Sequence, residues 1–300
     1  MTGRSRRVLP GAALVLVAVL VVGACSSAPE PEPEPEPEPA PAAPTQSLTV
    51  AGALPGEHVH GVSVDGADGT VHLATHEGLY RHDGAAWTQV GPVIDLMGFT
   101  AAEPGHFYAS GHPGPGVDLP NPVGLIESTD AGETWQVVSR AGSSDFHALT
   151  ASPAGVVAFD GSRLEVTTDG TTWAPLDVPV PPYAMDVSPD GRTILVTSRT
   201  GPIRSTDAGA GWATLVDVPL LQVVAWADDA TVVGVTPEGV VAVSEDAGDT
   251  WRDAATVRGP VQAVAAARTA DGALRVVLVT QTQALVSDDL DSGLLPLGEA

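Results

Sequence analysis

The histidines of this chain are confined to one stretch of the sequence. All eight lie between His58 and His147, and of three methionines only Met97 and Met185 follow the initiator. Imidazole nitrogen and thioether sulfur together form a soft ligand set that suits copper, particularly Cu(I). The pattern therefore predicts a transition-metal site of the copper type, with these candidate ligands: His58, His60, His76, Met97, His112, His147 and Met185.

A harder subset of the same residues would suit zinc instead. His58, His60 and His147 offer nitrogen, and Asp95 or Asp145 offers carboxylate oxygen, which are ligands that zinc accepts. The two carboxylates could otherwise orient the imidazoles from outside the metal's own shell. Each position also has an ordinary alternative, because a single histidine or methionine at the start of a strand is usually a packed core residue.

Carboxylates in the same region indicate hydrolysis as a second interpretation. A pair drawn from Glu77, Asp95, Asp118 and Asp145 could supply an acid and a nucleophile or base for cleavage of a glycosidic bond. Tyr183 is a further candidate nucleophile. Whether the chain is an enzyme is left open by these residues alone.

Repeated short segments determine how these residues must be positioned. Ser128–Trp135, Ser205–Trp212 and Ser244–Trp251 are near-identical, and looser copies occur around them. The aspartates of six copies are spaced by 47, 39, 38, 39 and 42 residues, a period typical of propellers. The repeated residues are Asp83, Asp130, Asp169, Asp207, Asp246 and Asp288, with Trp87, Trp135, Trp173, Trp212 and Trp251.

Each repeat has the content of one propeller blade. In the fourth copy, short β-branched runs at 185–188, 193–197, 202–205 and 212–215 are separated by turns. Four strands in about 40 residues make a blade. The sequence thus predicts an all-β, six-bladed propeller, with the strand 48–51 joining the last blade to close the ring. The expected blades are 58–91, 93–142, 145–179, 181–219, 220–259 and 260–298.

Over the whole folded domain, 47–300, these copies resemble the BNR/Asp-box repeat families. Those families include sialidases, sortilin-type receptors and photosystem assembly factors. The resemblance implies either sialidase-like glycoside hydrolysis or a scaffold that binds a protein or a glycan at the channel rim. Sialidases need three arginines around the substrate carboxylate, whereas only Arg199 is expected on this rim. The repeated aspartates are expected to be structural, since a short carboxylate can accept N–H groups within the turn between the third and fourth strands.

Aligning the repeats predicts where the candidate ligands lie. His60, Met97, His147 and Met185 would occupy one position in four successive blades, at the start of the innermost strand and hence at the mouth of the channel. Loops carrying His76 and His112 would open on the same face. An insertion at 112–122 is expected on this rim, where it could contact a protein partner.

The first 46 residues have a different character from the rest. Residues 1–24 combine a basic start with an apolar run, which indicates a secretory signal. Val22-Gly-Ala-Cys25 resembles a bacterial lipobox, which implies a lipidated Cys25 that anchors the chain to the outer face of the cytoplasmic membrane. Residues 25–46 are dominated by glutamate and proline and predict an extended, stiff spacer.

The charge of the chain excludes one class of partner. Beyond the leader there are ten arginines and no lysine, against 37 acidic residues in the chain. A nucleic-acid ligand needs its phosphates neutralised, so we expect no nucleic acid to bind. No nucleotide-cofactor motif occurs in the sequence either.

Overall fold

The computed structural model describes residues 49–50 and 53–299. The predicted signal (1–24), Cys25 and the whole predicted spacer (25–46) lie outside this part of the chain. The regular secondary structure of the described residues is β-strand, apart from the short 3₁₀ helix Leu290–Ser292. Among them there is no helix of the length and apolar character that crossing a membrane requires.

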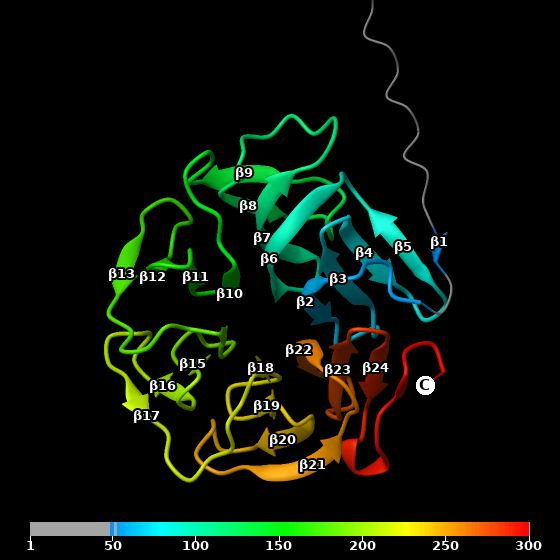
Figure 1. The fold of residues 1–300 in the computed structure, drawn as a ribbon, viewed down its shortest axis with the longest axis vertical. Coiled ribbons are helices and arrows are strands. Elements are labelled where there is room, and N and C mark those ends of the chain that lie inside the picture. Colours follow the sequence, from blue (N-terminus) through cyan, green and yellow to red (C-terminus); the bar gives the residue numbers. More distant parts are fainter. Residues whose placement is uncertain (1–48, 51–52, 300) are drawn as a thin grey trace, which may run out of the picture. The chain divides into compact units, whose positions relative to one another are not determined.

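Six sheets stand in a ring around a central axis, and each is built from strands that follow one another in the chain (Figure 1). This confirms the predicted six-bladed propeller. The innermost strands are β2 (Val59–Val64), β6 (Ile94–Glu103), β10 (Ala148–Ser152), β14 (Ala184–Val187), β18 (Val223–Trp226) and β22 (Val261–Arg268). The second strands are β3 (Val71–Thr75), β7 (His106–Pro113), β11 (Gly155–Phe159), β15 (Ile194–Thr197), β19 (Val232–Val235) and β23 (Leu274–Thr280).

The outer half of each blade is more exposed. The third strands are β4 (Gly78–His82), β8 (Leu125–Ser128), β12 (Leu164–Thr167), β16 (Ile203–Ser205), β20 (Val240–Ser244) and β24 (Ala284–Ser287). The outermost are β5 (Trp87–Val90), β9 (Gln136–Ser139), β13 (Ala174–Leu176), β17 (Ala213–Thr214), β21 (Arg252–Thr256) and β25 (Leu295–Pro296). The middle strands are buried on both faces because neighbouring blades cover them, which explains their continuous apolar runs.

The expected closure of the ring by residues 48–51 is wrong. The strand β1 (Thr49–Val50) pairs antiparallel with β5, on the outer edge of the first blade. The last blade is completed by its own β25, which pairs with β24. None of the strands in residues 49–50 and 53–299 is therefore shared between the first and last blades, and other contacts close the ring there.

The tryptophans supply one such contact, because each packs against the blade that precedes it. Trp135 packs on a cluster that includes Leu79 of the first blade, and Trp212 packs on one that includes Val157 of the third. Trp87 closes the circle, since its buried ring shares a cluster with Val277 of the sixth blade. Burying an aromatic side chain between sheets stabilises the contact through its large apolar area.

The repeated aspartates organise turns. Asp130 accepts the backbone N–H of Thr134 at 2.9 Å and its hydroxyl at 2.6 Å. The carboxylates of Asp169, Asp207 and Asp246 likewise accept N–H groups of their own turns.

The last blade requires a correction. Asp288 was expected in this role, but its carboxylate pairs with the guanidinium of Arg275. Asp289 accepts the hydroxyl of Ser292 at 2.7 Å instead. Asp289 lies two residues after Ser287, the last residue of β24. The three near-identical repeats have the same spacing between their serine and their aspartate.

A carboxylate near the axis joins three blades. Asp186 on β14 accepts the hydroxyl of Thr150 from the third blade and, at 2.8 Å, the N–H of Trp226 from the fifth. It also accepts the N–H of Val187 at 2.9 Å. Burial is the largest influence and raises the pKa of Asp186 to about 6, although the three donors lower it.

We expect Asp186→Asn to destabilise the propeller. An amide group has one acceptor oxygen, so at least one of the donors now bonded to Asp186 would be left unpaired near the axis. An unpaired buried donor costs about 1–3 kcal/mol, and the free energy of unfolding in urea should fall by that amount. Asp83→Asn is the matched control, because exposed Asp83 accepts only one long bond, from Ala85 at 3.3 Å.

Comparing wild type with Asp186→Asn at several pH values also tests the pKa of Asp186. A carboxyl group whose pKa is higher in the folded than in the unfolded state binds more protons when folded, so its contribution to stability declines as pH rises between the two values. The deficit of Asp186→Asn should therefore shrink between about pH 4 and pH 6. A deficit that grows over this interval would contradict the raised pKa.

Candidate functional site

Six residues, one from each blade, lie at the same point of the propeller, where the innermost strand begins. His60, Met97 and Gln262 are bulged out of the pairing between first and second strands. In the other three blades the equivalent residue donates its N–H to the second strand just before regular pairing starts. The resulting mouth ring consists of His60, Met97, His147, Tyr183, Gln222 and Gln262.

The mouth ring corrects one predicted ligand. Met185 was expected to share a position with His60 and His147, but Tyr183 holds that position. Met185 lies two residues further along β14, where only 8% of it is exposed and it joins a cluster with Val187 and Val196. Counting back from the repeated turn fails here because the β14–β15 hairpin, Ala184–Thr197, spans two residues more than the β10–β11 hairpin, Ala148–Phe159.

Two of the ring residues, His60 and Met97, stand at bulges of their strands. The pairing skips His60 between Val59 and Gly61, and it skips Met97 between Leu96 and Gly98. A bulge bends its strand and redirects a side chain, which is why bulges are common beside functional sites.

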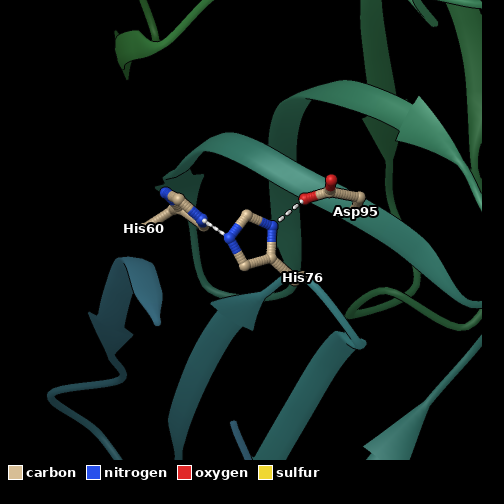
Figure 2. A group of neighbouring side chains, drawn as sticks. All are labelled: His60, His76 and Asp95. Carbon is tan, nitrogen blue, oxygen red and sulfur yellow. Dashed lines mark hydrogen bonds and ion pairs between the residues drawn. The ribbon is translucent and has the colours of Figure 1, made fainter. Parts of the chain in front are cut away.

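His60, His76 and Asp95 form the first histidine cluster (Figure 2). His76, in the turn between β3 and β4, has its Nε2 atom 3.2 Å from Nε2 of His60 and its Nδ1 atom 2.7 Å from Oδ1 of Asp95. The ring of His58 stands edge-on to that of His76, with 5.7 Å between centroids. Imidazoles from the first blade and a carboxylate from the second thus converge at one point of the mouth.

Burial lowers the pKa of His60, and the neighbouring His76 lowers it further. Charges on His58 and His147 act in the same direction, whereas Asp95 opposes them. A neutral imidazole retains a nitrogen lone pair, which is the form that binds a metal ion. The surroundings of His60 therefore favour its ligand form.

A second cluster is centred on Asp145. Its Oδ2 atom lies 2.9 Å from Nε2 of His147 and 3.3 Å from Nε2 of His112. The Nδ1 atom of His112 donates to Oδ1 of Asn121 at 2.7 Å, and this bond is the main cause that raises the pKa of His112. The seven predicted ligands thus lie in separate settings. His60 and His76 belong to the first cluster, and His58 stands beside it. His112 and His147 contact Asp145. Met97 is half-buried on the ring, and Met185 is in the core.

Of the four carboxylates named for hydrolysis, Asp95 and Asp145 are engaged with imidazoles, whereas within the described part of the chain no imidazole contact is found for Glu77 or Asp118. Asp95 is bonded to His76, and Asp145 contacts His112 and His147. Tyr183 is exposed, and its hydroxyl accepts from the amide of Gln222 at 3.3 Å.

Glutamines occupy the opposite side of the mouth, and sequence reasoning did not assign them a role. Gln262 accepts the N–H of Val59 at 2.6 Å, so it joins the sixth blade to the first. Gln222 donates to the carbonyl oxygen of Val261 across the next junction. Their identical place at the start of an innermost strand was the signal that could have identified them.

Below the mouth, the six innermost strands enclose a cavity of about 370 Å³. His60, His147, Tyr183 and Gln262 are among the residues that line it, together with Asp186 and apolar residues of the innermost strands. A volume of this size suits a small ligand.

Solved structures of low sequence identity share the fold. A GH74 enzyme from Niastella koreensis gives a TM-score of 0.56 at 17% identity, over 80% of this chain and 45% of that one. An ancestral GH74 enzyme gives 0.51 at 14% identity, over 80% and 37%. One chain of a nidogen/laminin complex gives 0.57 at 14% identity, over 75% and 91%.

These likenesses show the propeller and no more, because the identities are low. The chain spans less than half the length of either GH74 enzyme. Comparison with family models and with curated proteins gives no match.

Proposed function

We propose that this chain binds a transition-metal ion at the mouth of the propeller, through Nε2 of His60 and Nε2 of His76, with His58 as a third imidazole. The observation that carries the proposal is the 3.2 Å separation of those two nitrogens. Two imidazoles that bind a tetrahedral ion at about 2.0–2.1 Å place their nitrogens about 3.3 Å apart. The pair therefore already has the spacing that a shared ion requires.

The contact between His76 and Asp95 supports the same proposal. When Nδ1–H of His76 donates to the carboxylate, Nε2 carries the lone pair and is directed at His60. A carboxylate behind a ligating histidine fixes its orientation and raises its basicity. Asp95 would act in this way without binding the ion itself.

The donor set favours Zn²⁺, with Cu²⁺ as the second ion of choice. Imidazole suits both ions, whereas Cu(I) is selected by soft sulfur ligands. Copper was the expectation from the sequence because of Met97 and Met185. Packing of Met185 among Val187 and Val196 argues against a thioether-rich site, so we propose Zn²⁺ as the ion.

We also propose that the metal site is held outside the cytoplasm. The lipobox-like Val22–Cys25 and the Glu-Pro-rich spacer support lipid attachment at Cys25. In a tethered protein, the negative domain would be repelled by anionic lipid, and a stiff spacer would hold it at a distance.

The metal proposal predicts that His60→Ala and His76→Ala each abolish stoichiometric binding. Purified full-length protein should retain about one Zn²⁺ per chain after gel filtration, by elemental analysis, because three imidazoles bind one ion. Wild type with no bound metal, or variants with undiminished metal, would overturn the proposal. His106→Ala is the matched control, since His106 pairs with Glu127 at 2.7 Å, away from the cluster.

Met97→Leu and Met185→Leu test the identity of the ion. We expect both to bind Zn²⁺ and Cu²⁺ like wild type, because no thioether is needed. Weaker binding of copper in either variant would restore the sequence-based expectation of a sulfur ligand.

Asp95→Asn should weaken Zn²⁺ binding without abolishing it. Removal of the carboxylate behind a ligating histidine typically lowers metal affinity by about 10–100-fold, which competition with a chromogenic chelator can measure. Complete loss would indicate that Asp95 is itself a ligand.

Attachment at Cys25 predicts that Cys25→Ser releases the protein from membranes. After cell fractionation, wild type should sediment with the membranes and the variant should be soluble or remain unprocessed. A variant that is processed and still sediments like wild type would contradict lipidation at this cysteine.

A further inference from the structure

We infer that the cavity inside the propeller binds a small organic cation with an ammonium head, and that the carboxylate of Asp186 is its counter-charge. The inference is independent of the proposed metal site, because Asp186 belongs to the fourth blade and needs no bound ion. Three observations lead to it. Asp186 lines the cavity, its charge is unpaired, and one of its oxygens keeps a free acceptor position.

The negative charge of Asp186 is not balanced by a cationic side chain. Its carboxylate accepts the hydroxyl of Thr150 and the N–H groups of Val187 and Trp226, which are all neutral donors. None of the ion pairs formed by the described residues includes Asp186. An unpaired charge inside a protein attracts a cation more strongly than a charge at the surface does, because the local dielectric is lower.

One oxygen of Asp186 keeps room for a further donor. Oδ1 accepts from Thr150 and Val187, whereas among the described residues Oδ2 accepts from Trp226 alone, at 2.8 Å. A carboxylate oxygen has two acceptor positions, so Oδ2 can take one more hydrogen bond. An ammonium group supplies that donor together with the missing positive charge.

Asp186 can be reached from the cavity. It is only partly buried although it lies near the axis, and it is one of the residues that line the space of about 370 Å³ below the mouth. This volume lies within the range of small-molecule sites. A ligand that enters at the mouth would therefore meet the carboxylate in the wall of the cavity.

The charges around the cavity favour a cation over an anion. Asp186 is the one carboxylate among the lining residues, no arginine is among them, and the chain contains no lysine. His60 also lines the cavity, but burial lowers the pKa of its imidazole and so favours the neutral form. Tyr183, which is 60% exposed, adds an aromatic ring to the lining, and the faces of such rings attract ammonium groups.

The test follows the backbone amide signals of Val187 and Trp226 by NMR in purified, metal-free full-length protein. Both N–H groups bond to the carboxylate of Asp186, so their chemical shifts report a cation that joins it. Propylammonium, 1-propanol and propionate are the probes, because they are similar in size and differ in charge. At about pH 7.5, above the pKa of Asp186, we expect saturable shifts with propylammonium and none with the other two.

The amide of Thr134 is the internal control. It bonds to the carboxylate of Asp130 at 2.9 Å in an exposed turn, so it detects cations that gather at any acidic surface group. Such association should be screened in about 0.15 M NaCl, and the Thr134 signal should not shift. A shift of Thr134 that parallels those of Val187 and Trp226 would show non-specific attraction and overturn the inference.

Asp186→Asn is the matched variant. In its folded form it should bind propylammonium at least about 10-fold more weakly, because a hydrogen bond to a charged group is lost. Undiminished binding would overturn the inference. If the variant does not fold, the amides of wild type decide: no saturable shift, or an equal shift with 1-propanol, rules out a cation site at Asp186.

Discussion

The structure depends on closing a ring of six sheets in which none of the described strands joins the first blade to the last. β1 stays within the first blade, so closure relies on side chains. Near the outside, Trp87 is buried against the sixth blade, and near the axis Gln262 accepts the N–H of Val59. Asp186 joins three further blades close to the same axis. These contacts draw the starts of the innermost strands together, and the chemistry of the mouth follows from that convergence.

The mouth divides its ring residues between two tasks. On one side, Gln222 and Gln262 bond to backbone groups of the next blade and hold the ring together. On the other side, His60 and His147 bond to groups that a ligand can share or displace, and bulges or strand starts keep them directed at the opening. The side with Gln222 and Gln262 is thus fixed by bonds between blades, and the side with His60 and His147 is available for binding. This separation is why histidines can gather here without weakening the closure of the propeller.

Much of the fold could be predicted, because a repeat near 40 residues with a turn and a tryptophan leaves few architectures. The blade limits and the structural use of Asp130 needed only this local pattern. The mistakes concern loop length, long-range pairing and the repeat that matches the pattern least well. Met185 was placed on the mouth ring because one hairpin is longer than its counterpart, and Asp288 was chosen over Asp289 in the loosest repeat. The strand β1 was expected in the last blade, but β25 already occupies the outer edge of that blade.

By itself, the sequence determined the all-β repeat, the number of blades and the confinement of histidines to the first three of them. It could not determine which imidazole meets which carboxylate. His76 could bond to Asp95 of the next blade only once the curvature of the ring had placed the turn after β3 beside the start of β6. The tertiary structure likewise brought His112 of the second blade to Asp145 of the third. Such pairs are set by the angle between neighbouring sheets, which arises from packing across the whole ring and leaves no local mark in the chain.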